Sequence, residues 1–460
     1  MWLDEIFGYR LARLGVPAIG QNSFTDPHPP GFYLAEWLLT AFASSRSEWM
    51  WRWISVLAST IAVAVVWKIA RRHTGDRVAV SVGAVLMTLP AVGYYSQEAR
   101  ATMTLVALSA LSSWVTDRLL SQHDRRLQVF WTLLSVVGLW FGYSYVMVVA
   151  VQAAFLAGRH LRRIGWIVSF LTVGASGLLL VPWATSALRR VSLANASQQP
   201  LSPLRIAEVL SSNDPARFGE SVQTVIAGVI VSFLLIVAFG SVLVRPTVQR
   251  RYFAVQFVLP LTAYFVFSAV SGISVPQSEG KQFIVLLPSV LVLVGFAISA
   301  LRLRLPLLSS TTVGLSVILL VLNLVGLRTY WGTIKSPEGA LISMLGSTDT
   351  GRRPVISLHT SLSFATGMYL PTTNLFVNPQ SIGHELTFRY VTGDEFLVPT
   401  GPRSVVSLDR VREERRLWLV APSGVKSEAI EAIEGVCALT SGPVAGPFAA
   451  FDVQCSAPAP

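Results

Sequence analysis

Charge is scarce in this 460-residue chain. Only 13% of its residues are Asp, Glu, Lys or Arg, and 52% are apolar, whereas a soluble domain carries about 25% charged residues. Mean hydropathy is +0.56. The scarcity of charge indicates that a lipid bilayer surrounds most of the chain.

Two further features are missing. The first 30 residues lack the apolar core of roughly 7–15 residues that marks a cleavable signal peptide. No Gly-rich phosphate-binding loop of the nucleotide-binding type occurs. The net charge is +11, but the basic residues form short clusters between apolar runs, as the positive-inside rule predicts. We therefore predict a membrane protein that does not bind nucleic acid.

Apolar runs of about 20 residues recur through the part of the chain that ends at Leu327. Eight runs predict single membrane spans: Ile54–Trp67, Val78–Tyr94, Met103–Val115, Ile164–Trp183, Val222–Val244, Phe253–Val270, Phe283–Ala300 and Leu307–Leu327. Five basic clusters lie between these runs: Lys68–Arg77, Arg118–Arg126, Arg159–Arg163, Arg245–Arg251 and Arg302–Arg304. Since positively charged loops stay inside, we predict that these clusters are cytoplasmic.

The apolar stretch Val129–Ala157 has basic clusters on both sides, so it must cross the membrane an even number of times. At about 1.5 Å per residue, each half is roughly 20 Å long, which is short for a hydrocarbon core of about 30 Å. We predict two short helices that break near Gly142, Tyr143 and Ser144. The chain is then an all-α polytopic membrane protein with ten segments, and Met1–Arg52 and Arg189–Glu220 face the outside.

The tail Arg328–Pro460 differs in composition from the rest and is predicted to be a small extracytoplasmic α/β domain, after a membrane domain over residues 1–327. Its predicted elements are strands at Pro354–Leu358 and Arg416–Val420, a helix at Ser427–Glu434 and a turn-rich stretch at Gly442–Pro447. The only two cysteines, Cys437 and Cys455, lie in this tail. Outside the membrane they are candidates for a disulfide.

The first predicted outer loop holds residues suited to glycosyl transfer. It contains Asp4 and Glu5, and later the run Thr25-Asp26-Pro27-His28-Pro29-Pro30. An acceptor hydroxyl loses its proton only at a pH far above 7, so a positioned carboxylate must take that proton as the oxygen attacks the anomeric carbon. A carboxylate can equally hold a divalent cation that neutralises a leaving phosphate. His28, fixed between prolines, is suited to donate a hydrogen bond to phosphate.

Each feature also has a simpler explanation. Asp4 and Glu5 suit the first turn of a solvated helix, where the helix dipole favours acids. The prolines around His28 suit an ordinary turn. For each feature taken alone, both explanations remain open.

Taken in order, these residues resemble the bacterial protein-mannosyltransferase-like branch of the C-superfamily of glycosyltransferases. The shared order is Asp-Glu, some twenty residues, Asp-x-His-Pro-Pro-x-x-Tyr and an apolar helix. Other segments that resemble the family are Ser47-Glu48 with Trp51–Ser55, Lys68–Gly75, Tyr94–Arg100, and Glu279–Phe283 before Leu287-Pro288. The resemblance is closest over Met1–Arg126, weaker over Ser271–Gly295, and elsewhere rests on topology.

The resemblance implies roles for single residues. Asp4 matches the family's catalytic base or metal-linked carboxylate, and Glu5 is its companion. Asp26 and His28 match a second point of the loop, with Asp26 a candidate for the acceptor or a metal. In related lipid A aminoarabinose transferases, a lysine stands where His28 does and faces the carrier phosphate.

Two cations are predicted to face the outside beside helix ends. Arg100 and Lys281 are both suited to hold the donor phosphate. The simpler explanation is that both are interface residues whose charged ends reach toward water. The two explanations remain open for each residue.

The sequence departs from the family pattern in three places. Family members usually begin with a membrane helix before the Asp-Glu pair, whereas this chain starts four residues before Glu5. Either the natural start lies upstream or the protein is one span short. A family histidine-tyrosine pair reads Phe141–Tyr145 here, and a late basic-aromatic pair reads Lys281-Gln282. These departures bear on the acceptor and on activity, not on the fold.

The resemblance implies an enzyme of the plasma (inner) membrane. It moves a hexose or pentose, mannose-like or arabinose-like, from a polyprenyl-phosphate donor to a protein, glycan or lipid acceptor outside, with inversion. A Mg²⁺ or Mn²⁺ ion held at Asp4 remains an alternative to direct base catalysis.

Two other functions remain as alternatives. One is a flippase or transporter for lipid-linked sugars, and the other is an inactive membrane scaffold. Coupled transporters need ionisable groups near the bilayer midplane, and the predicted spans hold none at that depth. This pattern favours chemistry at the outer surface over transport.

Overall fold

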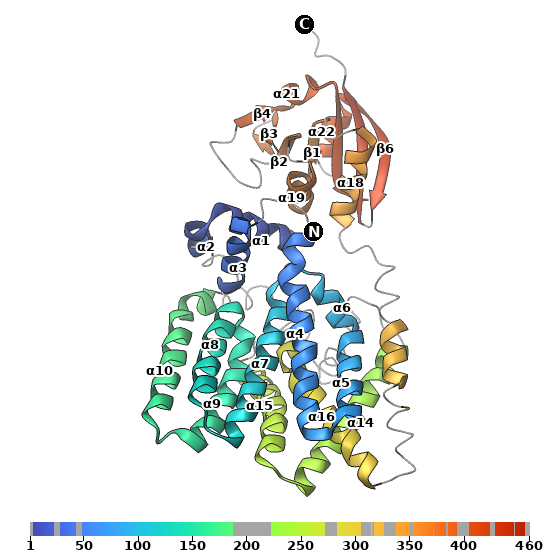
Figure 1. The fold of residues 1–460 in the computed structure, drawn as a ribbon. Helices are drawn as coiled ribbons and strands as arrows, with labels where there is room; N and C mark the ends of the chain where they lie inside the picture. Colours follow the sequence, from blue (N-terminus) through green and yellow to red (C-terminus); the bar gives the residue numbers. More distant parts are fainter. Residues whose placement is uncertain are drawn as a thin grey trace. The chain divides into compact units, whose positions relative to one another are not determined.

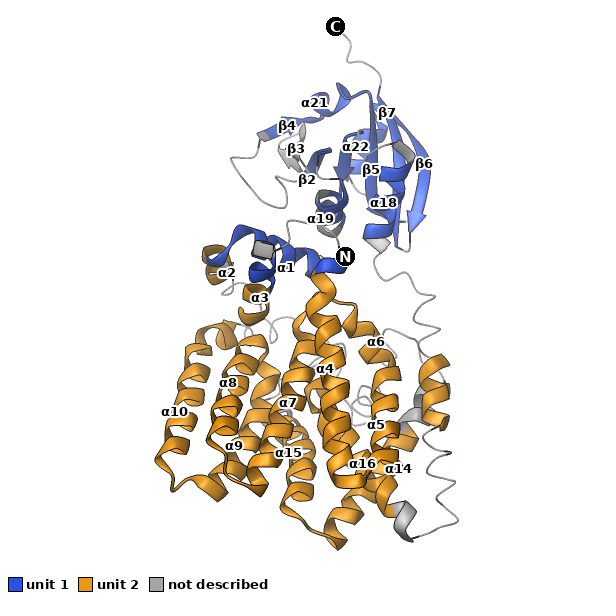
Figure 2. Ribbon diagram, viewed as in Figure 1, with its two compact units in different colours: residues 1–16, 36–50, 333–460 blue, residues 17–35, 51–332 orange. Residues whose placement is uncertain are grey.

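The computed structural model describes residues 3–22, 28–42, 48–186, 222–271, 283–304, 314, 317–325, 337–349, 353–370, 372–382, 385–392, 404–423, 428–445 and 447–455. Helices come first along the chain and a mixed sheet follows (Figure 1). The chain divides into two compact units (Figure 2). Unit 1 joins Met1–Val16 and Glu36–Met50 to Thr333–Pro460, and unit 2 comprises Pro17–Ala35 and Trp51–Gly332.

Unit 2 is a helical bundle built around α16. The helices that lie wholly or largely in it are α2 (Val16–Asn22), α4 (Glu48–Thr74), α5 (Asp76–Thr88), α6 (Pro90–Ser96), α7 (Ala101–Ser121), α8 (Arg125–Phe141), α9 (Val146–His160), α10 (Ile164–Leu179), α14 (Val222–Val244), α15 (Val248–Ser271) and α16 (Leu287–Arg304). Helix α16 packs against α5, α7, α14 and α15. Every residue from Phe283 to Ile298 is buried, because a helix that is apolar on all sides is most stable in the middle of a bundle.

Local signals in the sequence set the junction between α4 and α5. Gly75 has a φ of +86°, which a side chain would strain, and its N–H donates to the carbonyl of Arg71 at 3.1 Å. Asp76 opens α5 and forms an ion pair of 2.5 Å with Arg71. Helix α4 therefore ends at a glycine C-cap, inside the predicted basic cluster.

A bend of 56° separates α5 from α6. Pro90 has no N–H and its ring excludes a straight helix, so the N–H of Leu89 donates to Leu86 at 3.3 Å instead of to Val85. The carbonyl of Val85 receives side-chain donors in its place. Asn323, which is 1% exposed, places its Nδ2 3.4 Å from that oxygen and 3.2 Å from Thr88 Oγ1.

Helices α8 and α9 form the predicted hairpin. Helix α8 ends at Phe141, and one 3₁₀ turn, η1 (Tyr143–Tyr145), leads into α9, so the break lies where it was predicted. Buried side chains tie the hairpin to α7: Ser112 Oγ accepts from Tyr145 Oη and from Gln152 Nε2, both at 2.9 Å. Within the hairpin, Trp131 Nε1 donates to Gln152 Oε1 at 2.9 Å.

An ion-pair cluster joins α4 to the last turns of α7. Asp117 is fully buried, and its two carboxylate oxygens lie 3.2 Å from Arg72 Nη1 and 2.9 Å from His73 Nε2. Arg72 also donates to Ser121 Oγ at 2.8 Å. A buried carboxylate without such partners would cost several kcal/mol, so this cluster fixes α4 against α7.

The described helices support fewer spans than the ten predicted. By length and composition, Trp49–Thr74 and Phe283–Ala300 could each cross a membrane, and the bent α5–α6 pair makes a third. Helices α8, α9 and α10 have only 17, 15 and 16 residues, which is short for a core of about 30 Å. The polar side chains that join α7 to its neighbours lower its hydropathy. Part of the predicted span Leu307–Leu327 lies outside the described residues.

Unit 1 contains a seven-stranded sheet in the order β4-β3-β2-β1-β5-β7-β6. The strands are β1 (Val355–Ser357), β2 (Asn374–Ile382), β3 (Glu385–Thr392), β4 (Ser404–Ser407), β5 (Arg416–Pro422), β6 (Cys437–Ala445) and β7 (Phe448–Cys455), and the helices of this part are α18 (Pro337–Asp349), α19 (Thr360–Tyr369), α21 (Leu408–Arg412) and α22 (Glu428–Glu434). Strand β1 is parallel to β2 and β5, and the other neighbours are antiparallel. Phe376, Leu419 and Val453 lie in its buried core.

Three of the four elements predicted for the tail are confirmed: the two strands are β1 and β5, and the helix is α22. The prediction of a turn-rich stretch at Gly442–Pro447 is wrong for most of its length, because β6 continues to Ala445. A register shift between Ser441 and Val444 accommodates Gly442 and Pro443 within the strand. Strand β6 is at the sheet edge, where the missing N–H of a proline costs little.

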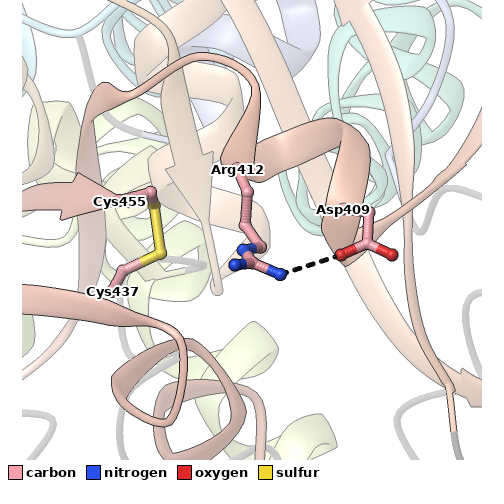
Figure 3. The surroundings of a disulfide bond; sticks show 4 residues. All are labelled: Asp409, Arg412, Cys437 and Cys455. Carbon is pink, nitrogen blue, oxygen red and sulfur yellow. Dashed lines mark hydrogen bonds and ion pairs between the residues drawn. A yellow bond between two sulfur atoms is a disulfide. The ribbon is translucent and has the colours of Figure 1, made fainter. Parts of the chain in front are cut away.

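The two cysteines, offered by the sequence as a disulfide candidate, are joined in the structure (Figure 3). They face each other in the β6–β7 register with Cα atoms 4.2 Å apart. Nearby, α21 carries an internal hydrogen bond of 3.2 Å from Arg412 to Asp409. The disulfide pins edge strand β6 to the end of β7.

Replacing both cysteines, Cys437→Ala with Cys455→Ala, should lower the stability of the full chain. The disulfide closes a loop with a sequence separation of 18, and a loop of that size contributes about 3 kcal/mol. The measurement is the thermal unfolding midpoint of detergent-purified protein with and without reductant. Reductant should lower the midpoint of the parent protein and leave the double variant unchanged. Equal midpoints for all four samples would contradict this role.

Candidate active site

His28 and Arg100, both predicted to bind phosphate, meet in unit 2. Arg100 Nη2 lies 3.2 Å from His28 Nε2, across 72 positions of sequence. His28 is half-buried and stands before two buried prolines, and Pro30 accepts the N–H of Leu34 at 3.0 Å as α3 (Gly31–Phe42) begins. The prolines fix the backbone on one side of His28, and the hydrogen bond with Arg100 holds its ring.

The chemistry of the two groups fixes the direction of the hydrogen bond between them. A guanidinium group can only donate, so Arg100 donates and Nε2 of His28 accepts. In this arrangement the histidine carries its proton on Nδ1, an assignment that follows from its partner. The pair therefore offers one permanent cation and one neutral ring with an N–H donor, a combination suited to a phosphate group.

Ser55 holds the backbone at Arg100. Its hydroxyl, fully buried in α4, donates to the carbonyl of Arg100 at 3.2 Å across 45 positions of sequence. Arg100 is the N-cap of α7 and has an extended backbone, with φ −146° and ψ 160°. Ser55 thus fixes the turn from which the guanidinium extends.

Asp4 and Glu5 begin α1 (Leu3–Leu14), which belongs to unit 1. The helix forms because buried residues recur at helical spacing, with Glu5, Tyr9 and Ala12 at most 2% exposed, and it ends before Gly15 at φ +85°. The side chain of Asp4 is outside the described part of the structure. The acids and the His28–Arg100 pair thus lie in different units.

Two predicted site residues lie outside the described residues, namely Asp26 and Lys281, as does the predicted outer loop Arg189–Glu220. Among the residues that the structure describes, no group of three His, Cys, Asp or Glu side chains could hold a metal ion. The proposed cation at Asp4 thus stays a prediction.

Sequence reasoning missed two residues near these elements, Ser55 as a support for Arg100 and Glu36. Glu36 is fully buried in α3 and is the only charged residue of that helix. Its signal in the sequence is a lone acid within an apolar run. For Ser55, the signal was its place in a segment that resembles the family.

Part of the chain matches a known protein family, and its fold is similar to that of solved structures. Residues 27–187 match a family model described as dolichyl-phosphate-mannose-protein mannosyltransferase. No curated protein matches the chain. Among solved structures, the chain is similar to ArnT from Cupriavidus metallidurans in the apo state, with 14% identity, a TM-score of 0.54, and coverage of 92% of this chain and 87% of that chain.

The chain is also similar to ArnT from the same organism bound to undecaprenyl phosphate, with 14% identity, a TM-score of 0.55, and coverage of 94% and 89%. At this identity the similarity shows the fold alone, and this chain shares the fold of ArnT. The resemblance found in the sequence is thereby confirmed. The segment matched by the family model contains both His28 and Arg100.

Proposed function

We propose that this chain, which carries the fold of the C-superfamily of glycosyltransferases, moves a sugar from a polyprenyl-phosphate carrier to an acceptor on the outer side of the plasma membrane. The observation that carries the proposal is the hydrogen bond between Arg100 and His28. Two side chains that local motifs marked separately as phosphate ligands are neighbours in space. The matching family, dolichyl-phosphate-mannose-protein mannosyltransferase, and the undecaprenyl phosphate bound in the ArnT complex support the same donor class.

The donor phosphate is proposed to bind at this pair. Arg100 donates two N–H groups in a fixed plane to phosphate oxygens, and His28 donates from Nδ1. Lys281 is proposed as a further cation at the same group. Together these donors stabilise the negative charge that grows on the phosphate as the sugar leaves.

The proposed reaction is one displacement at the anomeric carbon. The acceptor hydroxyl loses its proton to a carboxylate and its oxygen forms a bond to the anomeric carbon. The bond from that carbon to the phosphate oxygen breaks, and its electron pair leaves with the polyprenyl phosphate. Attack opposite the leaving group inverts the anomeric configuration.

Asp4 is proposed as the carboxylate that takes the proton, with Glu5 as its companion and Asp26 as a further residue of the acceptor side. The second form of the proposal gives Asp4 a Mg²⁺ or Mn²⁺ ion. The sugar (hexose or pentose) and the acceptor (protein, glycan or lipid) are set by groups beyond this pair. A panel of polyprenyl-phosphate sugars with purified protein would identify them.

Arg100→Gln should raise the KM for the donor. A hydrogen bond to a charged group is worth about 1.5–3 kcal/mol, so the expected rise is roughly 10- to 150-fold, with a smaller change in acceptor KM. The measurement is steady-state transfer in detergent or proteoliposomes. Arg77→Gln is the control, because Arg77 is an exposed arginine of a predicted cytoplasmic cluster. Equal donor KM values in both variants would contradict the phosphate site.

Ser55→Ala should give a weaker version of the same defect. It removes a hydrogen bond worth about 1 kcal/mol, so the donor KM should rise about fivefold. Ser59→Ala is the matched control in the same helix, because Ser59 donates to its own turn at Val56, at 2.7 Å, on an exposed face. If the two variants bind the donor alike, Ser55 does not support Arg100.

Asp4→Asn should abolish transfer while the protein stays folded and inserted. General-base catalysis contributes about 10²- to 10⁴-fold, so kcat should fall by at least about 100-fold in an assay with purified lipid-linked sugar. Asp76→Asn, which neutralises an exposed acid, should keep its activity. Near-parental turnover of Asp4→Asn would contradict the role proposed for Asp4. Chelation by EDTA separates the two forms of the proposal, since only a metal-linked Asp4 loses activity and regains it with Mg²⁺ or Mn²⁺.

A further inference from the structure

Helix α3 buries one acid in an otherwise apolar sequence. Its residues read GFYLAEWLLTAF, and Glu36 is its only charged side chain. Glu36 is 0% exposed. Because removing a carboxylate from water is costly, a fully buried one needs an arrangement that compensates for it.

The Glu36 carboxylate lies against α1 at Gly8. A Cβ atom added at Gly8 would lie 2.7 Å from Glu36 Oε2 and 3.5 Å from Oε1. The carboxylate therefore fills the space that any side chain at position 8 would occupy. Both residues belong to unit 1, so this contact lies within one compact body.

Gly8 lies on the side of α1 that carries the predicted catalytic acids. It follows Asp4 by four residues and Glu5 by three, and residues at these spacings share one face of a helix. Helix α1 also packs against α19 in the same unit. A group seated at Gly8 thus sets the rotation and depth of α1, and with them the position of Asp4.

We infer that Glu36 is a positioning residue for the proposed transfer: its carboxylate seats on α1 at Gly8 and holds Asp4 and Glu5 in place. This inference rests on the proposed function for its effect on catalysis. The contact between Glu36 and Gly8 involves only α1 and α3 and can be tested without any substrate. Glu36 acts through α1 and takes no part in proton transfer.

The first test is Gly8→Ala, with Gly20→Ala as its matched control. Both changes put alanine for glycine in a helix, which favours the helix by about 1 kcal/mol when space allows. Around Gly20, in α2, nothing lies within 4 Å of the added atom. Gly8→Ala should lower kcat about tenfold or more, with the donor KM within about twofold, and Gly20→Ala should change neither.

The second test is rescue by a shorter acid. In Gly8→Ala combined with Glu36→Asp, loss of one methylene withdraws the carboxylate and makes room for the new methyl group. The double variant should recover most of the kcat that Gly8→Ala loses, although Glu36→Asp alone lowers it. A merely additive loss would overturn the inference, because contacting residues couple and independent ones do not.

Hydrogen–deuterium exchange of the peptide that contains α1 tests the contact between Glu36 and Gly8 without catalysis. Gly8→Ala should speed exchange in α1 at least about tenfold relative to the parent and to Gly20→Ala, and the double variant should restore protection. Unchanged exchange in Gly8→Ala overturns the inference whatever the activity. If the exchange pattern is as expected while the parent protein transfers no sugar, the positioning of α1 by Glu36 is supported and the proposed function fails.

Discussion

Backbone groups inside an apolar bundle cannot turn to water, so each break in a helix must find its hydrogen-bond partners within the protein. The bend at Pro90 frees the carbonyl of Val85, and Asn323 reaches it from a distant helical segment. At the start of α16, Ser109 Oγ donates to the carbonyl of Val285 at 2.6 Å. Ser55 does the same for Arg100 where α7 begins. These buried donors fix where the chain can turn.

The position of Arg100 follows from this constraint. Helix α6 leaves the bend, and a short turn from Gln97 to Arg100 leads into α7. The bend sets the direction of that turn, and Ser55 sets its end. Asn323 and Ser55 therefore bear on the position of Arg100, the proposed phosphate ligand. The hydrogen bond to His28 holds the guanidinium in place, which lowers the cost of ordering it in the proposed binding of phosphate.

Local patterns in the sequence predicted the elements whose causes are local. Apolar runs bounded by basic clusters predicted the helices, and Gly142 with its neighbours predicted the hairpin break. The strands β1 and β5 followed from short apolar runs between turn residues. The bonds that fix these elements could not be predicted, because they join distant positions. Asn323 is 238 residues from Val85, and nothing near either residue in the sequence names the other.

The candidate site divides in the same way. His28 and Arg100 were each predicted from a local motif, but their hydrogen bond spans 72 positions and no spacing rule gives it. Glu36 was missed because a lone acid in an apolar run has no periodic pattern to mark it as buried. The role inferred for Glu36 depends on the structure, in which its carboxylate lies against Gly8. Lys281 and Asp26 stay predictions because they lie outside the described residues.

The chain shares its fold with ArnT at 14% identity because few positions of the bundle require one particular residue. Apolar packing tolerates many substitutions of similar volume, and a broken helix needs only some donor near the break. The proposed chemistry is confined to helix ends and the turns between them, where few side chains matter. The proton acceptor in this scheme lies in unit 1 and the phosphate cations lie in unit 2. The internal bonds of each unit therefore position its own part of the proposed chemistry.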